Sequence, residues 1–203
     1  MNQGLARLLS YTFHPAVMPV IGVVLIFEYS PYYTSTDMLY FTMLFAFTGT
    51  YLLPALVSVV LVKLGVVGSL EMKDAKDRRI PFLVAAVFFY LTASGMRDLP
   101  LPPQVYYFLL GSSMSIIIAF LFLQWMKVSA HTAGVSGLLA MLMVQSLLWE
   151  TDMSAAMIAV VLVAGILASA RLRLEAHTFT EIVLGFCCGF IPVFSIMYYL
   201  GVR

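Results

Sequence analysis

Charged residues are scarce in this chain of 203 residues. Asp, Glu, Lys and Arg together make up 10% of it, whereas hydrophobic residues make up 62%. A typical soluble domain carries roughly 25% charged residues and about half apolar ones. So few charges do not cover the surface of a water-soluble domain of this size. The composition therefore excludes a soluble domain and predicts a chain that crosses a membrane several times.

An excess of charge of one sign is also absent, because the formal net charge is +1. Duplex nucleic acid needs a concentrated basic surface, so this balance argues against nucleic acid as a partner. Cysteine is equally rare, and Cys187 and Cys188 stand side by side in an apolar run. We interpret both as packing residues, since adjacent cysteines seldom pair with each other. The sequence shows no repeat, low-complexity tract or soluble segment, and 1–203 is expected to be a single integral membrane domain.

Long apolar runs dominate the sequence instead. A membrane-spanning helix needs about 20 mostly apolar residues. Lipid offers the backbone no hydrogen-bond partners, and no run alternates with a period of two, so we expect helices rather than barrel strands. The predicted fold class is all-α, a polytopic transmembrane helical bundle of six or seven spans. The candidate runs are 15–30, 38–64, 80–96, 104–126, 133–149, 154–170 and 178–200.

The first run is the reason that the number of spans stays open. His14 and Pro15 interrupt its start, so it either crosses the membrane or lies partly in the interface, and we interpret His14 as an interfacial residue. Two sets of small residues predict close helix packing. They are the Gly185–Gly189 pair at GxxxG spacing and the run from Gly111 to Ser115.

The few ionisable residues gather in three turns. These are 71–81, 127–134 and 170–181, and alternate turns of such a bundle share one membrane face. The turns hold two of the three histidines, His131 and His177, with most of the cations. Ionisable groups at membrane depth are costly, so such a cluster is a functional-site hypothesis. Lys and Arg also accumulate on the cytoplasmic side of any membrane protein, so the cations alone could be an orientation signal. Histidine is not part of such a signal, and the two histidines therefore favour a functional site.

In order and spacing, these turns resemble the three signature motifs of the type 2 phosphatidic acid phosphatase superfamily of integral membrane lipid phosphatases. That pattern is Lys-x6-Arg-Pro, then Pro-Ser-Gly-His, then Ser-Arg-x5-His-x3-Asp. The third motif is the closest, with Arg171, His177 and Glu181 at the family spacing and a Glu in place of Asp. The resemblance covers about residues 71–181, the motif-bearing core of the domain.

The other two motifs depart further from the family pattern. The second reads Val128-Ser129-Ala130-His131, so a methyl group stands where the family has Gly. The first is one residue short and reads Lys73, five residues, then Arg79-Ile80-Pro81. The spacing therefore leaves open whether Lys73 or Lys76, and Arg78 or Arg79, faces the site.

The resemblance implies metal-independent hydrolysis of a phosphate ester, with no cofactor, through a phosphohistidine intermediate. His177 would be the nucleophile, with Glu181 holding its second ring nitrogen, and His131 would be the general acid. A guanidinium matches two phosphate oxygens, and a helix N-terminus offers free N–H groups. The implied phosphate-binding residues are Lys73, Arg79, Ser129 and Arg171.

The implied substrate is a phosphorylated lipid, such as a phosphatidate, a phosphatidylglycerophosphate or a polyprenyl phosphate, that enters from the bilayer. Its expected partners are therefore this substrate and membrane lipids, in a bacterial inner (cytoplasmic) membrane. The resemblance favours a site on the extracytoplasmic face, whereas the count of Lys and Arg favours the cytoplasmic face. The alternatives are a non-enzymatic transporter or lipid-phosphate-binding protein that retains a degenerate site, and a phosphatase of soluble esters.

A plain helical explanation also exists for the third motif. Arg173, His177 and Glu181 are four residues apart and would form a salt-bridged stripe on an unbroken helix. On such a helix Arg171 and His177 would point about 240° apart, because there are 3.6 residues per turn. A working phosphate site therefore requires a break between them, with the preceding span ending near Ala170.

Overall fold

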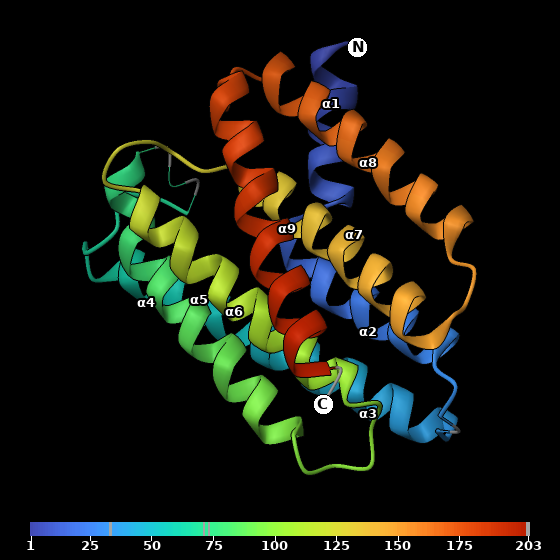
Figure 1. The fold of residues 1–203 in the computed structure, drawn as a ribbon. Coiled ribbons are helices and arrows are strands. Elements are labelled where there is room, and N and C mark those ends of the chain that lie inside the picture. Colours follow the sequence, from blue (N-terminus) through green and yellow to red (C-terminus); the bar gives the residue numbers. More distant parts are fainter. Residues whose placement is uncertain (33, 71, 73, 202–203) are drawn as a thin grey trace.

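The computed structural model describes residues 1–32, 34–70, 72 and 74–201, and this part of the chain is an all-helical bundle without strands (Figure 1). The predicted all-α fold class is confirmed. Seven helical segments of the described chain are long and apolar enough to cross a membrane, which makes it a multi-pass membrane protein by length and composition. The helices are α1 (Gln3–Thr12), η1 (Pro15–Val17), α2 (Met18–Tyr29), α3 (Thr36–Phe47), η2 (Thr48–Leu52), α4 (Leu53–Lys63), α5 (Ala75–Met96), α6 (Gln104–Phe122), α7 (Ala130–Trp149), α8 (Ser154–Arg173) and α9 (Phe179–Gly201).

The first two spans are interrupted helices. The first comprises α1 and α2 with the short turn η1 between them, because Pro15 has no N–H with which to continue α1. It begins at Gln3 rather than at residue 15, and its 27 residues are enough to cross a membrane. In the second span one turn of π-helix, η2, separates α3 from α4. Such turns are frequent at functional sites.

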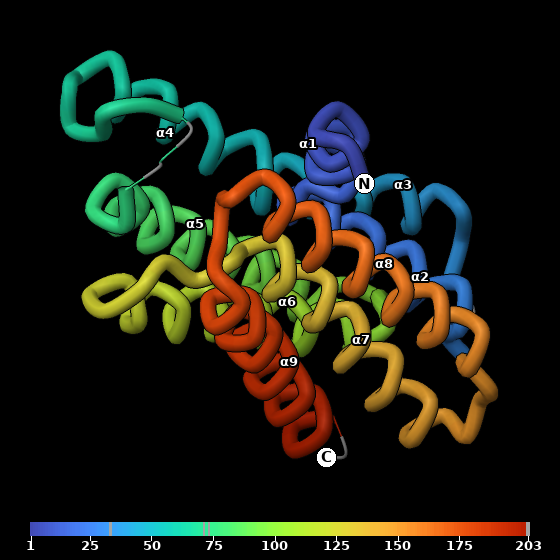
Figure 2. Tube along the Cα trace, turned by 90° about the horizontal axis from the view of Figure 1, so that it is seen from above, coloured from blue at the N-terminus to red at the C-terminus, as the bar shows by residue number. Residues whose placement is uncertain are grey.

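The helix α7 lies at the centre of the bundle. In its most apolar window 56% of the residues are buried, against 11% for α8 at the periphery. It packs against α9 and α8, while α9 also packs against α6 and α1 lies along α8 (Figure 2). Side chains that α7 carries are therefore held on several sides at once.

Two glycines allow α9 to approach α7 closely. A Cβ at Gly185 would collide with Thr132 Oγ1, and one at Gly189 would collide with the carbonyl oxygen of Ala133. Hydroxyl groups of α7 fasten the contact, since Thr132 donates to the carbonyl of Ile182 at 3.1 Å. The predicted packing role of the GxxxG pair is confirmed. This contact sets the N-terminus of α7 beside that of α9.

Serines of α6 hold two neighbouring helices. Ser113 Oγ donates to the carbonyl oxygen of Ala86 in α5 at 2.8 Å, and Ser115 Oγ lies 3.3 Å from that of Gly189 in α9. Both hydroxyl groups are buried. The small residues between Gly111 and Ser115 therefore pack helices together, as the sequence predicts.

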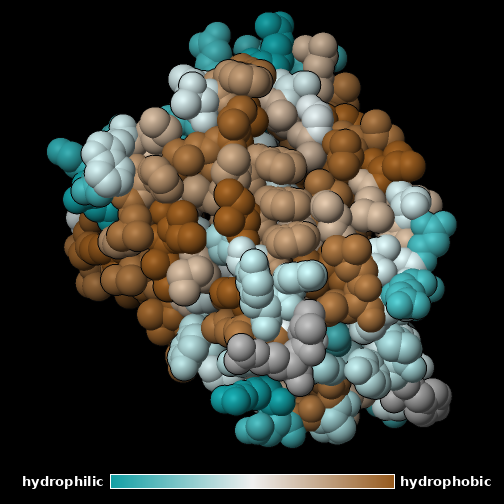
Figure 3. Space-filling model, in the orientation of Figure 1, coloured by the Kyte–Doolittle hydropathy of each residue, from teal (hydrophilic) through white to brown (hydrophobic). Residues whose placement is uncertain are grey.

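Hydrophobic side chains cover the middle of the face that Figure 3 shows, and hydrophilic residues lie towards its margins. Large apolar residues such as Leu83, Tyr90 and Leu162 are more than half exposed on the outer helices. A bilayer supplies the apolar surroundings that this surface requires.

Candidate functional site

The three polar turns meet at one end of the bundle, the end that carries the N-terminus in Figure 1. Arg78 at the start of α5 donates from Nη1 to the carbonyl oxygen of Val128 at 3.3 Å. The backbone N–H of Lys127 donates to Glu181 Oε1 at 3.1 Å. Segments about 50 residues apart are thus joined by direct hydrogen bonds, as the alternation of the spans predicts.

The chain leaves helical geometry between α8 and α9. The helix α8 continues to Arg173, three residues beyond the predicted end at Ala170, and α9 begins at Phe179. Glu175 adopts the left-handed conformation, with φ of 50°. The stripe of Arg173, His177 and Glu181 on one continuous helix is therefore wrong, because five residues between the two helices are not helical.

Glu181 organises the start of α9. Thr178 Oγ1 accepts the backbone N–H of Glu181 at 3.3 Å, and Glu181 Oε2 accepts the backbone N–H of Thr178 at 3.0 Å. This reciprocal pair is a capping box, which satisfies two N–H groups that a helix start leaves without partners. The same carboxylate receives the N–H of Lys127, so it also ties α9 to the segment that precedes α7.

Hydrogen bonds determine the tautomer of His177. Its Nδ1 lies 3.1 Å from the carbonyl oxygen of Lys127 and 3.2 Å from Glu181 Oε2. Both oxygens only accept, so Nδ1 carries the proton and the neutral ring keeps its lone pair on Nε2. Burial lowers the pKa of His177, and the charges of Arg78, Arg171 and Lys127 lower it further, against a smaller opposing effect of Glu181. The imidazole is therefore neutral at pH 7.

A cavity of about 710 Å³ opens at this end of the bundle. Its lining carries four cations and one carboxylate, together with two histidines from different spans. These residues are Arg7, Arg78, Lys127, Arg171, Glu175, His14 and His131. Ligand cavities of about 300–1,000 Å³ are common, so its size suits a small ligand, and its charge suits an anion.

Three of these cations come from three different turns. Arg78, Lys127 and Arg171 lie close enough to interact electrostatically with one another. Among the described residues, no carboxylate lies within ion-pair distance of Arg78 or Arg171. Arg171 Nε is also buried without a hydrogen-bond partner in this part of the chain. Burial lowers the pKa of Lys127, and Arg78 lowers it further. An anion in the cavity would relieve this repulsion.

The predicted site residues do not all reach the cavity. Arg171 and His131 line it. Arg79 is exposed and does not line it, whereas its neighbour Arg78 does, so Arg78 is the cation of the first motif that faces the site. Lys73 lies outside the described residues.

The remaining predicted residues, Ser129, His177 and Glu181, do not line the cavity. Ser129 is fully buried against Gly185, and its Oγ has no hydrogen-bond partner among the described residues. The His177 side chain is 1% exposed, and that of Glu181 is 16% exposed. Two neighbours of His177 do line the cavity: Lys127, whose carbonyl oxygen lies 3.1 Å from His177 Nδ1, and Ala176, which precedes it in the chain.

The first span supplies residues that the sequence reasoning missed. His131 Nε2 lies 3.1 Å from the carbonyl oxygen of Ser10 in α1, so Nε2 carries the proton and Nδ1 keeps the lone pair. The ring of His14 lies edge-on to that of His131, with 5.7 Å between ring centroids and an angle of 79°. His14, which we interpret from the sequence as an interfacial residue, is exposed and also lines this cavity. A His-Pro pair at a span start signals a break, but no pattern in the sequence assigns its ring to this cavity.

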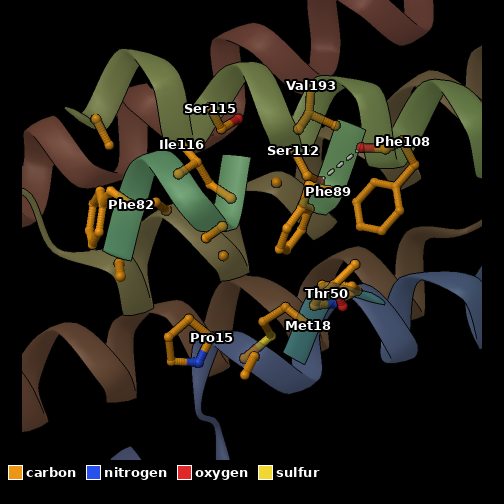
Figure 4. Close-up of a pocket in the computed structure, with 18 of the residues that line it drawn as sticks. Pro15, Met18, Thr50, Phe82, Phe89, Phe108, Ser112, Ser115, Ile116 and Val193 are labelled. Atoms are coloured by element: carbon orange, nitrogen blue, oxygen red, sulfur yellow. Dashed lines mark hydrogen bonds between the residues drawn. The ribbon is translucent and has the colours of Figure 1, made fainter. Parts of the chain in front are cut away.

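Figure 4 shows a second, smaller cavity of about 210 Å³, which shares one lining residue, His14, with the first. It lies between η1, α2, η2, α5, α6, α7 and α9, and apolar side chains such as Met18, Phe89 and Phe108 line it. Among the described residues, no group of three or more His, Cys, Asp and Glu side chains is arranged to hold a metal ion.

Comparison of the chain with models of protein families, with curated proteins and with solved structures gave no match.

Proposed function

We propose that this protein is an integral membrane phosphatase that hydrolyses a phosphorylated lipid through a phosphohistidine intermediate. The observation that carries the proposal is the cationic cavity, in which Arg78, Lys127 and Arg171 surround one space that His14 and His131 also line. The same three cations act electrostatically on the buried His177. Planar guanidinium groups bind two phosphate oxygens each, and an ammonium group adds a point charge. The resemblance of the three turns to the lipid phosphatase motifs supports the same reaction.

In the proposed reaction the cations hold the phosphoryl oxygens, and His177 Nε2 attacks the phosphorus atom in line with the ester oxygen. The P–O ester bond breaks as the P–N bond forms, and its electron pair leaves with the ester oxygen. His131 acts as the general acid: its Nδ1, which keeps the lone pair in the resting site, takes the proton of the substrate's phosphate monoanion and delivers it to that oxygen. Its Nε2–H stays with the carbonyl oxygen of Ser10, which leaves Nδ1 to carry the transferred proton. Water then attacks the phosphohistidine, which releases phosphate and restores His177.

The apolar cavity supports a lipid ester rather than a soluble one. It shares His14 with the cationic cavity and provides apolar surroundings for part of a hydrocarbon chain. Phosphatidate, phosphatidylglycerophosphate and polyprenyl phosphate all combine a phosphate with such a chain. A bacterial cytoplasmic membrane is the proposed location.

One observation favours a second candidate function. The His177 side chain is 1% exposed and does not line the cavity, so the nucleophile reaches the phosphate only after a local rearrangement. A protein that only binds or transports a lipid phosphate needs the cations but no such movement. The second candidate is therefore a non-enzymatic binding protein or transporter.

Turnover by the purified chain in detergent tests both candidates. We expect release of inorganic phosphate from dioleoyl phosphatidate, with and without EDTA, and loss of at least a thousandfold in kcat for His177→Gln. Arg171→Gln should lower kcat/KM by at least a hundredfold, because the variant lacks the guanidinium group that contacts the phosphate. The matched control is Arg173→Gln. Arg173 is exposed, donates to the carbonyl of Met1 and does not line the cavity.

The outcomes separate the candidates. Saturable phosphatidate binding that Arg171→Gln weakens, without any turnover, favours the binding protein. Full activity of His177→Gln rejects the phosphohistidine route. Absence of both binding and turnover rejects both candidates.

A further inference from the structure

His14 stands at the break in the first span and outside the three polar turns. The chain bends there because Pro15 cannot donate a hydrogen bond to α1. The bend is capped by His14 itself, whose Nδ1 accepts the backbone N–H of Ala16 at 3.2 Å. In the neutral ring Nδ1 is therefore the acceptor, and Nε2 on the opposite side carries the proton. His14 thus offers a single hydrogen-bond donor on the side of the ring that faces away from its own backbone.

This donor lies where the two cavities meet. Of the described residues, His14 alone lines both the cationic cavity and the apolar cavity. Its ring is 5.7 Å from that of His131 and 6.4 Å from that of Tyr51, measured between centroids. His131 is on the cationic side, and Tyr51 belongs to the π-turn η2 beside the apolar side. A ligand that occupies both cavities therefore passes His14.

The hydroxyl groups that line the apolar cavity have no proton free to donate to a ligand. Thr50, Ser112 and Ser115 each donate their hydroxyl proton to the backbone carbonyl four residues earlier in the same span, at 2.8, 2.8 and 3.0 Å. Figure 4 shows Phe82, Phe89 and Ile116 directed into the same space. Burial of hydrocarbon is favourable in such a cavity, whereas a polar ligand would lose hydrogen bonds with water.

We propose that His14 is a third functional histidine, which donates its Nε2–H to the oxygen that joins the phosphate of the substrate to its hydrocarbon chain. The inference rests on the proposed lipid-phosphate ligand of this site. Phosphate binds among the cations, the chain enters the apolar cavity, and the linking oxygen comes to the boundary at which His14 lies. A soluble ester has no chain to hold its linking oxygen there. His14 therefore contributes to a preference for esters that carry a hydrocarbon chain over soluble esters.

His14→Asn separates this role from a structural one. Asn is among the best N-cap residues, so its side-chain oxygen still accepts the N–H of Ala16, but it does not reach the boundary as the imidazole does. We expect kcat/KM for dioleoyl phosphatidate to fall at least tenfold, mostly through KM. With para-nitrophenyl phosphate, which has no chain, kcat/KM should change less than twofold. His14→Ala removes the cap as well and should in addition lower the melting temperature.

Equal effects on the two esters, or no effect of His14→Asn on either, would overturn the specificity role. If the wild-type chain hydrolyses neither ester, the phosphatase proposal is rejected, but the role of His14 in ligand binding is still testable. In that case dioleoyl phosphatidate is titrated into the purified chain in detergent. Binding at least tenfold weaker in His14→Asn than in wild type supports the role, and unchanged binding overturns it.

Discussion

At the scale of the residue, one carboxylate joins the parts of the site. Glu181 accepts N–H groups from Thr178 and Lys127 and also from the ring of His177. A Gln at this position has one acceptor oxygen in place of two, and its NH₂ group would face a donor. We expect Glu181→Gln to cost about 2 kcal/mol of unfolding free energy, since a hydrogen bond to a charged group is lost and a donor is left unpaired.

Thermal unfolding in detergent measures this loss, as a melting temperature lower by roughly 5 °C. Glu175→Gln is the matched control, because the exposed carboxylate of Glu175 forms no ion pair among the described residues. Equal melting temperatures of the two variants would show that Glu181 does not organise the turn.

The buried imidazole of His177 predicts how stability depends on pH. The pKa of His177 is lowered in the folded protein by burial and by Arg78, Arg171 and Lys127, whereas the unfolded chain has an ordinary value of about 6.5. As the pH falls below about 6.5, the unfolded state binds the proton first, so the contribution of His177 to stability is lost from there downwards. Above about 6.5 that contribution is complete.

We expect the melting temperature of the wild type to fall with pH in this acid range more steeply than that of His177→Gln. A series of unfolding scans at constant ionic strength measures the two slopes. Parallel curves for the two proteins would mean that the folded-state pKa of His177 is not lowered.

The contact between His177 and Glu181 could be predicted from the sequence because their spacing is local. The choice between Arg78 and Arg79 could not. On α5 these neighbours point about 100° apart, and which of them faces the cavity depends on how α5 is rotated against the segment that contains Val128. His14 lay beyond sequence reasoning for the same reason, since its partner His131 is more than a hundred residues away.

At the scale of the element, the break between α8 and α9 could not be read from the local sequence. Residues 172–176 are good helix formers, without Gly or Pro. The contacts of Glu181 and His177 with the segment before α7 compete with helix propensity and prevail. The break leaves Glu175 at φ of 50°, where a residue with a Cβ is disfavoured by roughly 1–2 kcal/mol.

Glu175→Gly should therefore raise the free energy of unfolding by about 0.5–1 kcal/mol, which is less than the strain because Gly also gains freedom in the unfolded chain. Glu175→Gln keeps the Cβ and removes the charge, so it shows how much of any change is electrostatic. Chemical or thermal unfolding in detergent measures both variants. A Gly variant less stable than the Gln variant would contradict a strained turn.

The contact between α7 and α9 is an element-scale feature that the GxxxG spacing does predict. Gly189→Ala places a methyl group against the carbonyl oxygen of Ala133 and the hydroxyl of Ser136, and we expect a loss of about 1–3 kcal/mol from overpacking. Gly165→Ala in α8 is the matched control. No atom lies within 4 Å of its added Cβ, and the helix gains propensity.

Activity or phosphatidate binding should fall with Gly189→Ala and stay unchanged with Gly165→Ala, because α7 and α9 carry His131 and Glu181. Melting temperature and phosphate release, measured on the same preparations, test both statements. Equal melting temperatures and equal phosphate release for the two alanine variants would mean that the close approach of α7 and α9 contributes to neither stability nor activity.

At the scale of the whole molecule, composition and run length predict the membrane bundle, because an apolar run of about 20 residues is long enough to cross the hydrocarbon core of a bilayer as a helix. They do not predict that residues of the first span line the cationic cavity. That arrangement depends on α1 packing along α8 and on the bond between His131 and the Ser10 carbonyl. Both are contacts between segments more than a hundred residues apart, which no local pattern records.

The arrangement of the spans predicts the side on which each turn is accessible. The turns around Lys76, Gln124 and Glu175 belong to the cationic end, and those around Asp98 and Asp152 belong to the other end; all five residues are exposed. In sealed vesicles that contain Cys187→Ser and Cys188→Ala, we expect a membrane-impermeant maleimide to label Lys76→Cys, Gln124→Cys and Glu175→Cys from one and the same side. Asp98→Cys and Asp152→Cys should react only from the opposite side, because an odd number of spans separates the two sets. Labelling after permeabilisation controls for reactivity. Labelling of Lys76→Cys and Glu175→Cys from opposite sides would rule out a common cavity for Arg78 and Arg171, whichever membrane face it occupies.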